Sequence, residues 1–340
     1  MEIEKESLFG KSLDEILESV AALGMPKFTG KQISRWLYKK QVRSFDDMLN
    51  ISLKNRELLK DNYTIARSEV VSVQESADGT KKYLYKTGGG RFIESAYIPE
   101  AKRSTLCLST QVGCKMGCEF CATGKQGFNG HLTAAEIVNQ LFSLPEFSAV
   151  TNIVYMGMGE PLDNYEAVRS SLDLLTAEWG YAMSPRRITV STVGLIPQLK
   201  RLIEETQVHI AVSLHSPFDK ERASFMPVEN KYKVKDVVDL LKKYDWRGQR
   251  RISFEYIVFE GINHSDAHVK ELARLLNGLR CRINLIRFHE IPGSRFGTTR
   301  DESIETFKEQ LNKKGILTTI RASRGQDIDA ACGLLSTKMM

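Results

Sequence analysis

The pattern of hydrophobic and polar positions divides the chain near residue 100. Up to about residue 65, apolar residues recur at the spacing of amphipathic helices over 12–23, 30–40 and 52–61, with a shorter helical segment near Phe45. Residues 70–97 alternate instead, with turn signals at 78–79 and 88–90. We therefore expect a small helical accessory domain over residues 1–65 and an antiparallel β linker over residues 66–100.

Residues 101–340 alternate between short β-branched or apolar runs and helical patterns. Strands are expected at 105–110, 152–156, 187–191, 208–214, 252–259, 282–288 and 317–321, and helices at 133–143, 165–177, 195–204, 235–243, 266–277 and 303–313. Repeated strand–helix units predict an α/β fold with a parallel sheet, either open or closed into a full or partial barrel. In either form, functional residues are expected at the carboxyl ends of the strands.

Composition fits a cytoplasmic enzyme. The chain has 340 residues, 42% of them hydrophobic, a charged N-terminal stretch, and no apolar run near the roughly 18 residues of a membrane span. Its six cysteines are then expected to be reduced, which favours metal binding or catalysis over a disulfide framework.

The net charge of +6 is compatible with a polyanionic partner. Five basic residues and one acid, Asp245, fall within residues 242–251, with Tyr244 and Trp246 between them; the basic residues are Lys242, Lys243, Arg247, Arg250 and Arg251. Arg280, Arg282 and Arg287 follow. A solvated helix end would give the same pattern, but we favour nucleic-acid binding.

The most specific motif is a run of three cysteines, Cys114, Cys118 and Cys121, spaced C-x3-C-x2-C. A cubane iron–sulfur cluster needs one ligand per iron, so three thiolates leave one iron open for chemistry. Glycines before two of these cysteines, Gly113 and Gly117, allow the loop to curl around a cluster. A structural zinc site is disfavoured because the chain offers no second C-x2-C or H-x3-H pair.

Polar residues follow several of the predicted strands. The strand at 152–156 runs into Gly157-Met158-Gly159-Glu160-Pro161, whose carboxylate could accept from an ammonium group. Ser191 and the run Ser213-Leu214-His215 end the next two strands, and Asn284 lies on a later one. Each could be an ordinary loop or strand residue, and only their shared sheet edge favours a binding site.

Three cysteines lie outside the motif. We expect Cys281 to be a small buried residue, and Cys107 lies on the strand that leads into the cysteine loop. Cys332 stands in a polar, glycine-flanked segment and is expected to be accessible, as a nucleophile must be.

Phe120 before the last cysteine completes a pattern that resembles the radical S-adenosylmethionine (SAM) superfamily, and nearly the whole chain resembles its RlmN/Cfr family of RNA methyltransferases. The segments that carry this resemblance are 92–99, 157–161, 213–215 and 327–333. The resemblance implies a partial (β/α) barrel with an RNA-contacting N-terminal extension, and a 4Fe–4S cluster on Cys114, Cys118 and Cys121. It also implies SAM binding, two molecules per turnover, by Gly159, Glu160, Ser191, Ser213, Leu214, His215 and Asn284.

The resemblance further implies that Cys332 carries a methyl group, that Cys107 later attacks its sulfur to leave a transient disulfide, and that Glu94 accepts a proton. A 5′-deoxyadenosyl radical would activate the methyl group. Expected partners are 23S rRNA, tRNA and an electron donor such as flavodoxin or ferredoxin, with a monomeric enzyme. Segments 288–294 and 321–327 favour methylation at adenine C2. The alternatives are Cfr-like methylation at C8, a radical activase of a protein partner, and a non-catalytic iron–sulfur RNA-binding protein.

Overall fold

A ten-stranded mixed sheet forms the centre of the molecule in the computed structural model, which describes residues 5–246, 248 and 250–337. The strand order is β14-β13-β12-β11-β10-β9-β6-β5-β4-β3. The first seven strands in this order, from β14 to β6, are parallel to one another. The last three, β5, β4 and β3, extend the sheet in antiparallel fashion. Because β14 and β3 stand at its two ends, the sheet is open, as in the partial barrel that was expected.

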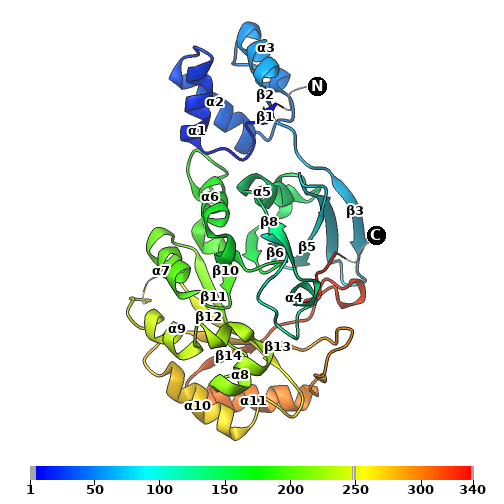
Figure 1. Cartoon of the computed structure of the whole chain (residues 1–340), viewed down its shortest axis with the longest axis vertical. Coiled ribbons are helices and arrows are strands. Elements are labelled where there is room, and N and C mark those ends of the chain that lie inside the picture. The colour runs from blue at the N-terminus through cyan, green and yellow to red at the C-terminus, as the bar shows by residue number, and fades with distance from the viewer. Residues whose placement is uncertain (1–4, 247, 249, 338–340) are drawn as a thin grey trace.

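The parallel strands alternate with helices, as the sequence predicts. The strands are β6 (Arg103–Cys107), β9 (Asn152–Tyr155), β10 (Ile188–Thr192), β11 (His209–Ser213), β12 (Ile252–Val258), β13 (Arg282–Arg287) and β14 (Leu317–Ile320). The helices are α5 (Ala134–Phe142), α6 (Tyr165–Thr176), α7 (Ile196–Glu205), α8 (Asp219–Phe225), α9 (Val234–Leu241), α10 (Asp266–Leu276) and α11 (Asp301–Lys313). Figure 1 shows several of these helices around the periphery of the strands. Side chains such as Val190, Ile210 and Phe254 are fully buried because one sheet face packs on the helices.

The N-terminal part is helical and its position is fixed by contacts with the core. It consists of β1 (Glu6–Ser7), α1 (Leu13–Ala22), α2 (Lys27–Tyr38), α3 (Leu53–Asn62) and β2 (Tyr63–Thr64), and Figure 1 shows it at one end of the molecule. The Arg67 guanidinium lies over the rings of Phe9 and Phe142, 4.7 and 5.4 Å from their centroids. Ser34 Oγ donates to the Trp179 carbonyl at 2.8 Å. The antiparallel segment follows as β3 (Val70–Glu75), β4 (Lys81–Lys86) and β5 (Phe92–Glu100).

The sequence patterns did not reveal the short elements around the cysteine loop. These are β7 (Gln111–Gly113), α4 (Ala122–Gln126) and β8 (Phe128–His131), where β7 pairs with β8 in antiparallel fashion. Elements of three to five residues carry too few positions to show a period. The helix α8 was missed because its seven residues are mostly polar.

A C-terminal clasp closes part of the open side of the sheet. We use this name for the contacts between residues 324–327, which follow β14, and the β3–β4 turn at 76–80. Asp327 accepts from Ser76 Oγ at 2.5 Å and from the Ala77 N–H at 3.2 Å, while Asp78 accepts from the Gly325 N–H at 2.9 Å. Figure 1 shows the C-terminal segment beside β3 as a result. The clasp directs residues 328–337 back across the sheet.

Candidate active site

The cysteine loop is framed by the β7–β8 pair, and its glycines adopt the conformation that the sequence predicts. Gly113 has φ +73° and Gly117 has φ +64°. A Cβ on Gly113 would lie 1.7 Å from the Gly127 carbonyl oxygen, so only glycine fits there. The Cys114 N–H donates to the same carbonyl at 3.1 Å. Backbone geometry therefore fixes where the loop begins.

The three motif cysteines face a poorly solvated region suited to a cluster. Cys118 is buried and Cys114 and Cys121 are half-buried, and all six cysteines are free thiols. Burial raises the pKa of Cys114 to about 12 and that of Cys118 well above its usual value, and Arg222 opposes the shift at Cys118. Within the described residues no three His, Cys, Asp or Glu side chains gather around a single ion position. A cubane takes one thiolate on each ligated iron, and these buried and half-buried thiols fit such a group.

Arg222 places a fully buried positive charge near the cysteine loop. Its guanidinium donates to the carbonyls of Leu214 (2.9 Å), Ser213 (2.8 Å) and Val193 (3.1 Å) and pairs with Glu229. A buried cation needs such partners, and its charge favours the thiolate form of Cys118. Sequence reasoning missed this residue, because one arginine in a short polar helix carries no distinctive pattern.

Glu160 and Gly159 form a tight turn after β9. Glu160 is 3% exposed, and its carboxylate accepts from Thr192 Oγ1 (2.7 Å) and the N–H groups of Val193 (3.0 Å) and Leu162 (3.0 Å). Burial outweighs these bonds and raises its pKa to about 7. Gly159 has φ +98°, and a Cβ there would lie 2.5 Å from Gln111. A carboxylate has about four acceptor sites, so Glu160 keeps capacity for an ammonium group.

The run Ser213-Leu214-His215 ends β11 in a strained conformation. His215 has φ +57°, and its Nδ1 accepts the Ile257 N–H at 2.9 Å, which puts the ring hydrogen on Nε2. Burial lowers the pKa of His215 to about 3. Its ring meets Phe120 of the cysteine loop edge to face, with centroids 4.8 Å apart. His215 therefore connects the strand end to the loop.

The pairing register places most of the predicted residues on one sheet face. Ser213, Glu255, Asn284 and Thr319 are partners across β11, β12, β13 and β14. Ser191 is in register with Ala211, which pairs with Ser253. Cys107 pairs with Ala96 and so lies on the face that also carries Glu94, two residues away on β5. Side chains in register share a face because their period along each strand is two.

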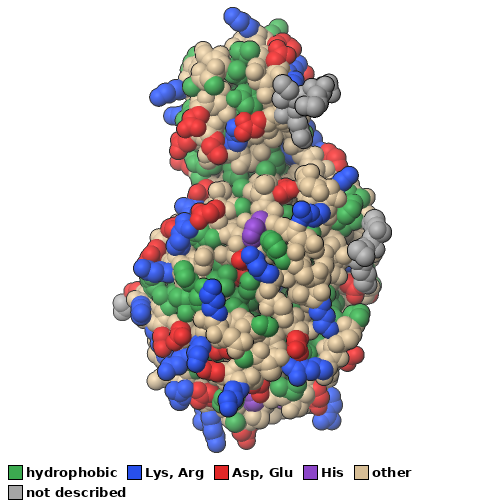
Figure 2. Space-filling view, in the orientation of Figure 1, with side chains coloured by type: hydrophobic (Ala, Val, Ile, Leu, Met, Phe, Trp, Pro, Cys, Tyr) green, Lys and Arg blue, Asp and Glu red, His purple; other side chains and the backbone are tan. Residues whose placement is uncertain are grey.

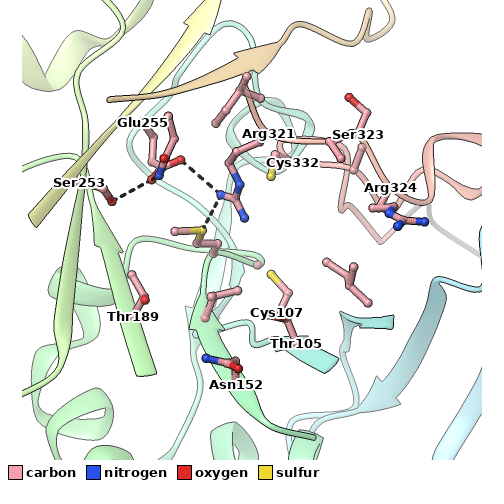
Figure 3. Close-up of a pocket in the computed structure, with 18 of the residues that line it drawn as sticks. Thr105, Cys107, Asn152, Thr189, Ser253, Glu255, Arg321, Ser323, Arg324 and Cys332 are labelled. Atoms are coloured by element: carbon pink, nitrogen blue, oxygen red, sulfur yellow. Dashed lines mark hydrogen bonds and ion pairs between the residues drawn. The ribbon is translucent and has the colours of Figure 1, made fainter. Parts of the chain in front are cut away.

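A cavity of about 590 Å³ opens on this face and contains the two isolated cysteines. Cys107 and Cys332 line it together with Cys121 and Asn284, and Figure 3 shows the side chains of the first two pointing into it. Cys107 is 8% exposed and Cys332 is exposed, as the sequence context predicts for Cys332. The Ala122 N–H donates to the Gly333 carbonyl at 2.8 Å, which ties the Cys332 segment to the cysteine loop. Ser191, Ser213, His215 and Glu160 do not line this cavity.

Glu94 lies beneath the C-terminal segment, in a second cavity of about 370 Å³. Its carboxylate is 3.2 Å from Lys82 Nζ and accepts the Ser336 N–H at 3.0 Å. Burial raises the pKa of Glu94, and the ion pair with Lys82 opposes the shift. Residues 328–337 therefore separate Glu94 from Cys107 although both stand on one sheet face.

Two charged residues of the main cavity were missed by sequence reasoning. Glu255 is 4% exposed on β12 and accepts from Ser253 (3.1 Å) and Asn284 (2.7 Å). Arg321 follows β14 and lies 3.3 Å from Glu255 Oε2. A lone acid in the apolar run Ile252-Ser-Phe-Glu-Tyr-Ile-Val was the available signal, because a buried carboxylate must have partners.

Part of the basic segment at 242–251 binds backbone carbonyls of the fold and does not form the exposed RNA-binding surface that was expected. Arg250 donates to the carbonyls of Val208 and Ile203 at 2.8 and 2.7 Å, and Lys242 donates to the Leu275 carbonyl at 2.9 Å, so both support the fold. Arg247 lies outside the described residues. Arg251 lines the main cavity, as do Arg103, Arg186, Arg282 and Arg324. His209 and His289 also line it, but burial lowers the pKa of both, so they add little charge. The positive charge thus gathers at the cavity.

Comparison with known proteins gives matches along the whole chain. The profile described as the radical SAM superfamily matches residues 108–276, and that of the ribosomal RNA large subunit methyltransferase N-terminal domain matches residues 7–65. A crystal structure of a radical SAM methyltransferase from Sphaerobacter thermophilus superposes with a TM-score of 0.91 at 40% identity, covering 97% of this chain and 99% of that one.

Two curated relatives cover nearly all of the chain. A probable dual-specificity RNA methyltransferase RlmN of Bacteroides thetaiotaomicron is 55% identical over 333 residues, 98% of this chain and 96% of the relative. A dual-specificity RNA methyltransferase RlmN of Syntrophus aciditrophicus is 42% identical over 344 residues, 100% of this chain and 99% of the relative. The chain therefore belongs to the RlmN family of radical SAM RNA methyltransferases.

Proposed function

We propose that this enzyme methylates C2 of a specific adenine in 23S rRNA, and of the adenine next to the anticodon in tRNA, through a methylated Cys332. The observation that carries the proposal is that Cys107 and Cys332 line one cavity with Cys121 of the cysteine loop. An adenine C2–H has no lone pair to attack a sulfonium methyl group, so a direct displacement fails. A protein sulfur that first takes the methyl group, and then presents it to a radical, avoids this difficulty.

Cys114, Cys118 and Cys121 would hold a 4Fe–4S cluster, which on reduction with bound SAM supplies a 5′-deoxyadenosyl radical. One buried and two half-buried thiols, with a buried arginine near Cys118, fit such a group. The proposed SAM-binding residues are Gly159, Glu160, Ser191, Ser213, Leu214, His215 and Asn284. Gly159 permits close backbone approach, and Glu160 can accept from an ammonium group.

Cys332 and Cys107 have the exposures that their proposed roles need. Cys332 is exposed in the cavity, where its thiolate can take a methyl group from SAM by substitution. Cys107 is buried beside it, where it would attack the Cys332 sulfur after the methylene carbon has joined the base. A transient disulfide between them follows.

Glu94 is the proposed acceptor of the ring proton. Its raised pKa suits a base, and it shares a sheet face with Cys107. In the state described, the Glu94 carboxylate accepts the Ser336 N–H and pairs with the Lys82 ammonium group. We therefore propose that residues 328–337 shift when RNA is bound, so that the two cavities join.

The arginines that line the main cavity would contact the phosphates of a flipped nucleotide. The enzyme would act as a monomer in the cytoplasm, with flavodoxin or ferredoxin as electron donor. The proposed division is an RNA-contacting domain over residues 1–65, a β linker over 66–100 and the catalytic barrel over 101–340. The helices described contain no segment long and apolar enough to cross a membrane.

The test is anaerobic reconstitution with SAM, a reductant and RNA, followed by mass spectrometry of nucleosides. We expect 2-methyladenosine from the unaltered enzyme and none from Cys332→Ala. Cys107→Ala should accumulate RNA covalently attached to Cys332, because the thiol that releases it is missing. Cys281→Ala is the matched control, since this cysteine lies outside both cavities.

Two outcomes would contradict the proposal. Formation of 8-methyladenosine would assign the enzyme to the other regiochemistry. A Cys107→Ala protein that carries no attached nucleotide under any turnover condition would remove Cys107 from the release step.

A further inference from the structure

Arg321 brings a positive charge to Cys107 and Cys332 in the main cavity. It directly follows β14, and its N–H continues the sheet ladder by donating to the Leu285 carbonyl at 2.8 Å. Its charge interacts with both Cys107 and Cys332. Figure 3 shows the guanidinium extending into the space where the two sulfur atoms lie.

A row of side chains fixes the guanidinium. Thr319 Oγ1 donates to Asn284 Oδ1 at 2.9 Å, and Asn284 Nδ2 donates to Glu255 Oε1 at 2.7 Å. Arg321 Nη1 then lies 3.3 Å from Glu255 Oε2 and 3.3 Å from Met156 Sδ. The buried Glu255 carboxylate accepts from three side chains, and only its Oε2 atom contacts Arg321. The other guanidinium N–H groups stay available, because arginine has five.

The remaining surroundings of Cys107 are apolar. It packs against Ala96 and Ile98 of β5, Val154 and Met156 of β9, and Ile328 and Ala330 of the C-terminal segment. Among the residues described, Arg321 and Cys332 are the titratable groups whose charges act on it. Burial raises the pKa of Cys107 to about 12, and Arg321 works against this shift. A thiol in such a site needs a nearby cation to react as a thiolate.

We propose that Arg321 is the cationic partner of Cys107, positioned by Glu255 and Asn284, and that it allows Cys107 to act as a thiolate when it attacks the Cys332 sulfur. This inference rests on the proposed role of Cys107. The role of Arg321 is to position charge beside the reacting sulfur.

Arg321 serves the step that frees the RNA from Cys332. The Cys107 thiolate forms an S–S bond with Cys332 while the bond between the Cys332 sulfur and the methylene carbon breaks. The electron pair passes to that carbon and into the purine ring, and a proton completes the methyl group. The two sulfurs are oxidised and the carbon is reduced. A dithiol reductant then restores both thiols.

The first test measures Cys107 alone, without RNA or SAM. The reconstituted holoenzyme is treated with methyl methanethiosulfonate from pH 6 to pH 10, and modification of Cys107 is followed by peptide mass spectrometry. In Arg321→Gln we expect the curve of Cys107 modification rate against pH to shift to higher pH by about one unit. The rate at pH 7.5 should then fall about tenfold. Arg321→Lys should restore most of the reactivity. Arg274→Gln removes the same charge from the exposed face of α10 and should stay within twofold of the unaltered enzyme.

The second test follows release of RNA. With Arg321→Gln, covalently attached RNA should accumulate at pH 7.5 and be released when the pH is raised to 9, whereas Cys107→Ala should retain it at both values. Superimposable Cys107 profiles in Arg321→Gln and the unaltered enzyme would overturn the inference, even if the affinity for RNA or SAM changed. A shifted profile with no methylated RNA from any variant would instead contradict the proposed function and leave Arg321's effect standing. Iron content and cluster absorbance identify a variant that fails to fold, in which case Arg321→Lys decides.

Discussion

Cys107 and Cys332 line the same cavity but differ in exposure, and this difference matches the order in which they would act. Cys332 is exposed and can meet a bulky sulfonium, whereas Cys107 is 8% exposed among apolar side chains. A reactive thiolate that is always exposed is also open to oxidation. At the scale of single residues, burial would keep Cys107 for the later step, and on our proposal Arg321 would allow it to react there.

His215 offers a prediction at the same scale. Its pKa of about 3 lies below the unfolded value of about 6.5, so its contribution to stability is present above pH 6.5 and is lost as the pH falls toward 3. Between pH 7 and pH 5 this amounts to about 2 kcal/mol of unfolding free energy. His215→Asn keeps an acceptor for the Ile257 N–H and tolerates the positive φ, but cannot become charged.

We expect His215→Asn to lower the unfolding free energy at pH 7 by about 1–3 kcal/mol, because the ring contact with Phe120 is lost. Its stability should then fall less between pH 7 and pH 5 than that of the unaltered protein. Urea unfolding at both values measures this. Equal pH dependence in the two proteins would show that His215 does not titrate below its usual range.

The cysteine loop begins at a constrained backbone position. Gly113 and Gly127 both have positive φ, +73° and +78°, but only at Gly113 would a Cβ strike the backbone, 1.7 Å from the Gly127 oxygen. Gly113→Ala must therefore displace Cys114, whereas Gly127→Ala meets nothing within 4 Å and costs only the conformational penalty of roughly 1–2 kcal/mol. We predict that Gly113→Ala loses most of its iron after reconstitution and that Gly127→Ala retains it, as measured by iron content and cluster absorbance. Equal loss in both variants would mean that φ, and not the contact, controls the loop.

The C-terminal clasp gives a second prediction for an element. Asp327→Ala removes the acceptor for Ser76 Oγ and the Ala77 N–H, so residues 328–337 should leave the sheet more often. We expect faster hydrogen exchange in this segment and a several-fold lower rate of methyl transfer, with unchanged iron content. Glu309→Ala, which removes an exposed acid from α11, is the control. If exchange rises but methyl transfer is unaffected, the clasp does not position Cys332.

The elements also show how far the sequence could lead. The periodic helices and strands and the cysteine loop's positive φ values were predictable, because period and glycine content are local properties. The row Thr319–Asn284–Glu255–Arg321 was not, since it depends on the register of β12, β13 and β14. The cover over Glu94 depends equally on the clasp, which joins residues about 250 positions apart. Contacts between distant segments carry no local signal in a single sequence.

At the scale of the whole molecule, arginine side chains from several strands and loops meet at the main cavity. Figure 2 shows Lys and Arg side chains interspersed with acids over the face in view. Around the cavity, by contrast, burial and then Arg251, Arg250 and Arg282 lower the pKa of His209, which reflects a local excess of cations. This distribution favours capture of a nucleotide at the active site over broad electrostatic coating of RNA.

RNA binding should therefore depend on salt through the cavity arginines. Neutralising several phosphates makes affinity fall steeply between 50 and 200 mM salt, and each lost phosphate contact lowers the slope of log K against log salt by about 0.7–0.9. The double variant Arg251→Gln/Arg282→Gln should lower that slope by roughly 1.5, measured by fluorescence anisotropy with a labelled rRNA hairpin. Arg274→Gln/Lys308→Gln removes the same charge from α10 and α11 and should leave the slope unchanged, because both side chains pair with acids on their own helices. If the two double variants lower the slope equally, net charge accounts for RNA binding and the cavity arginines have no special part in it.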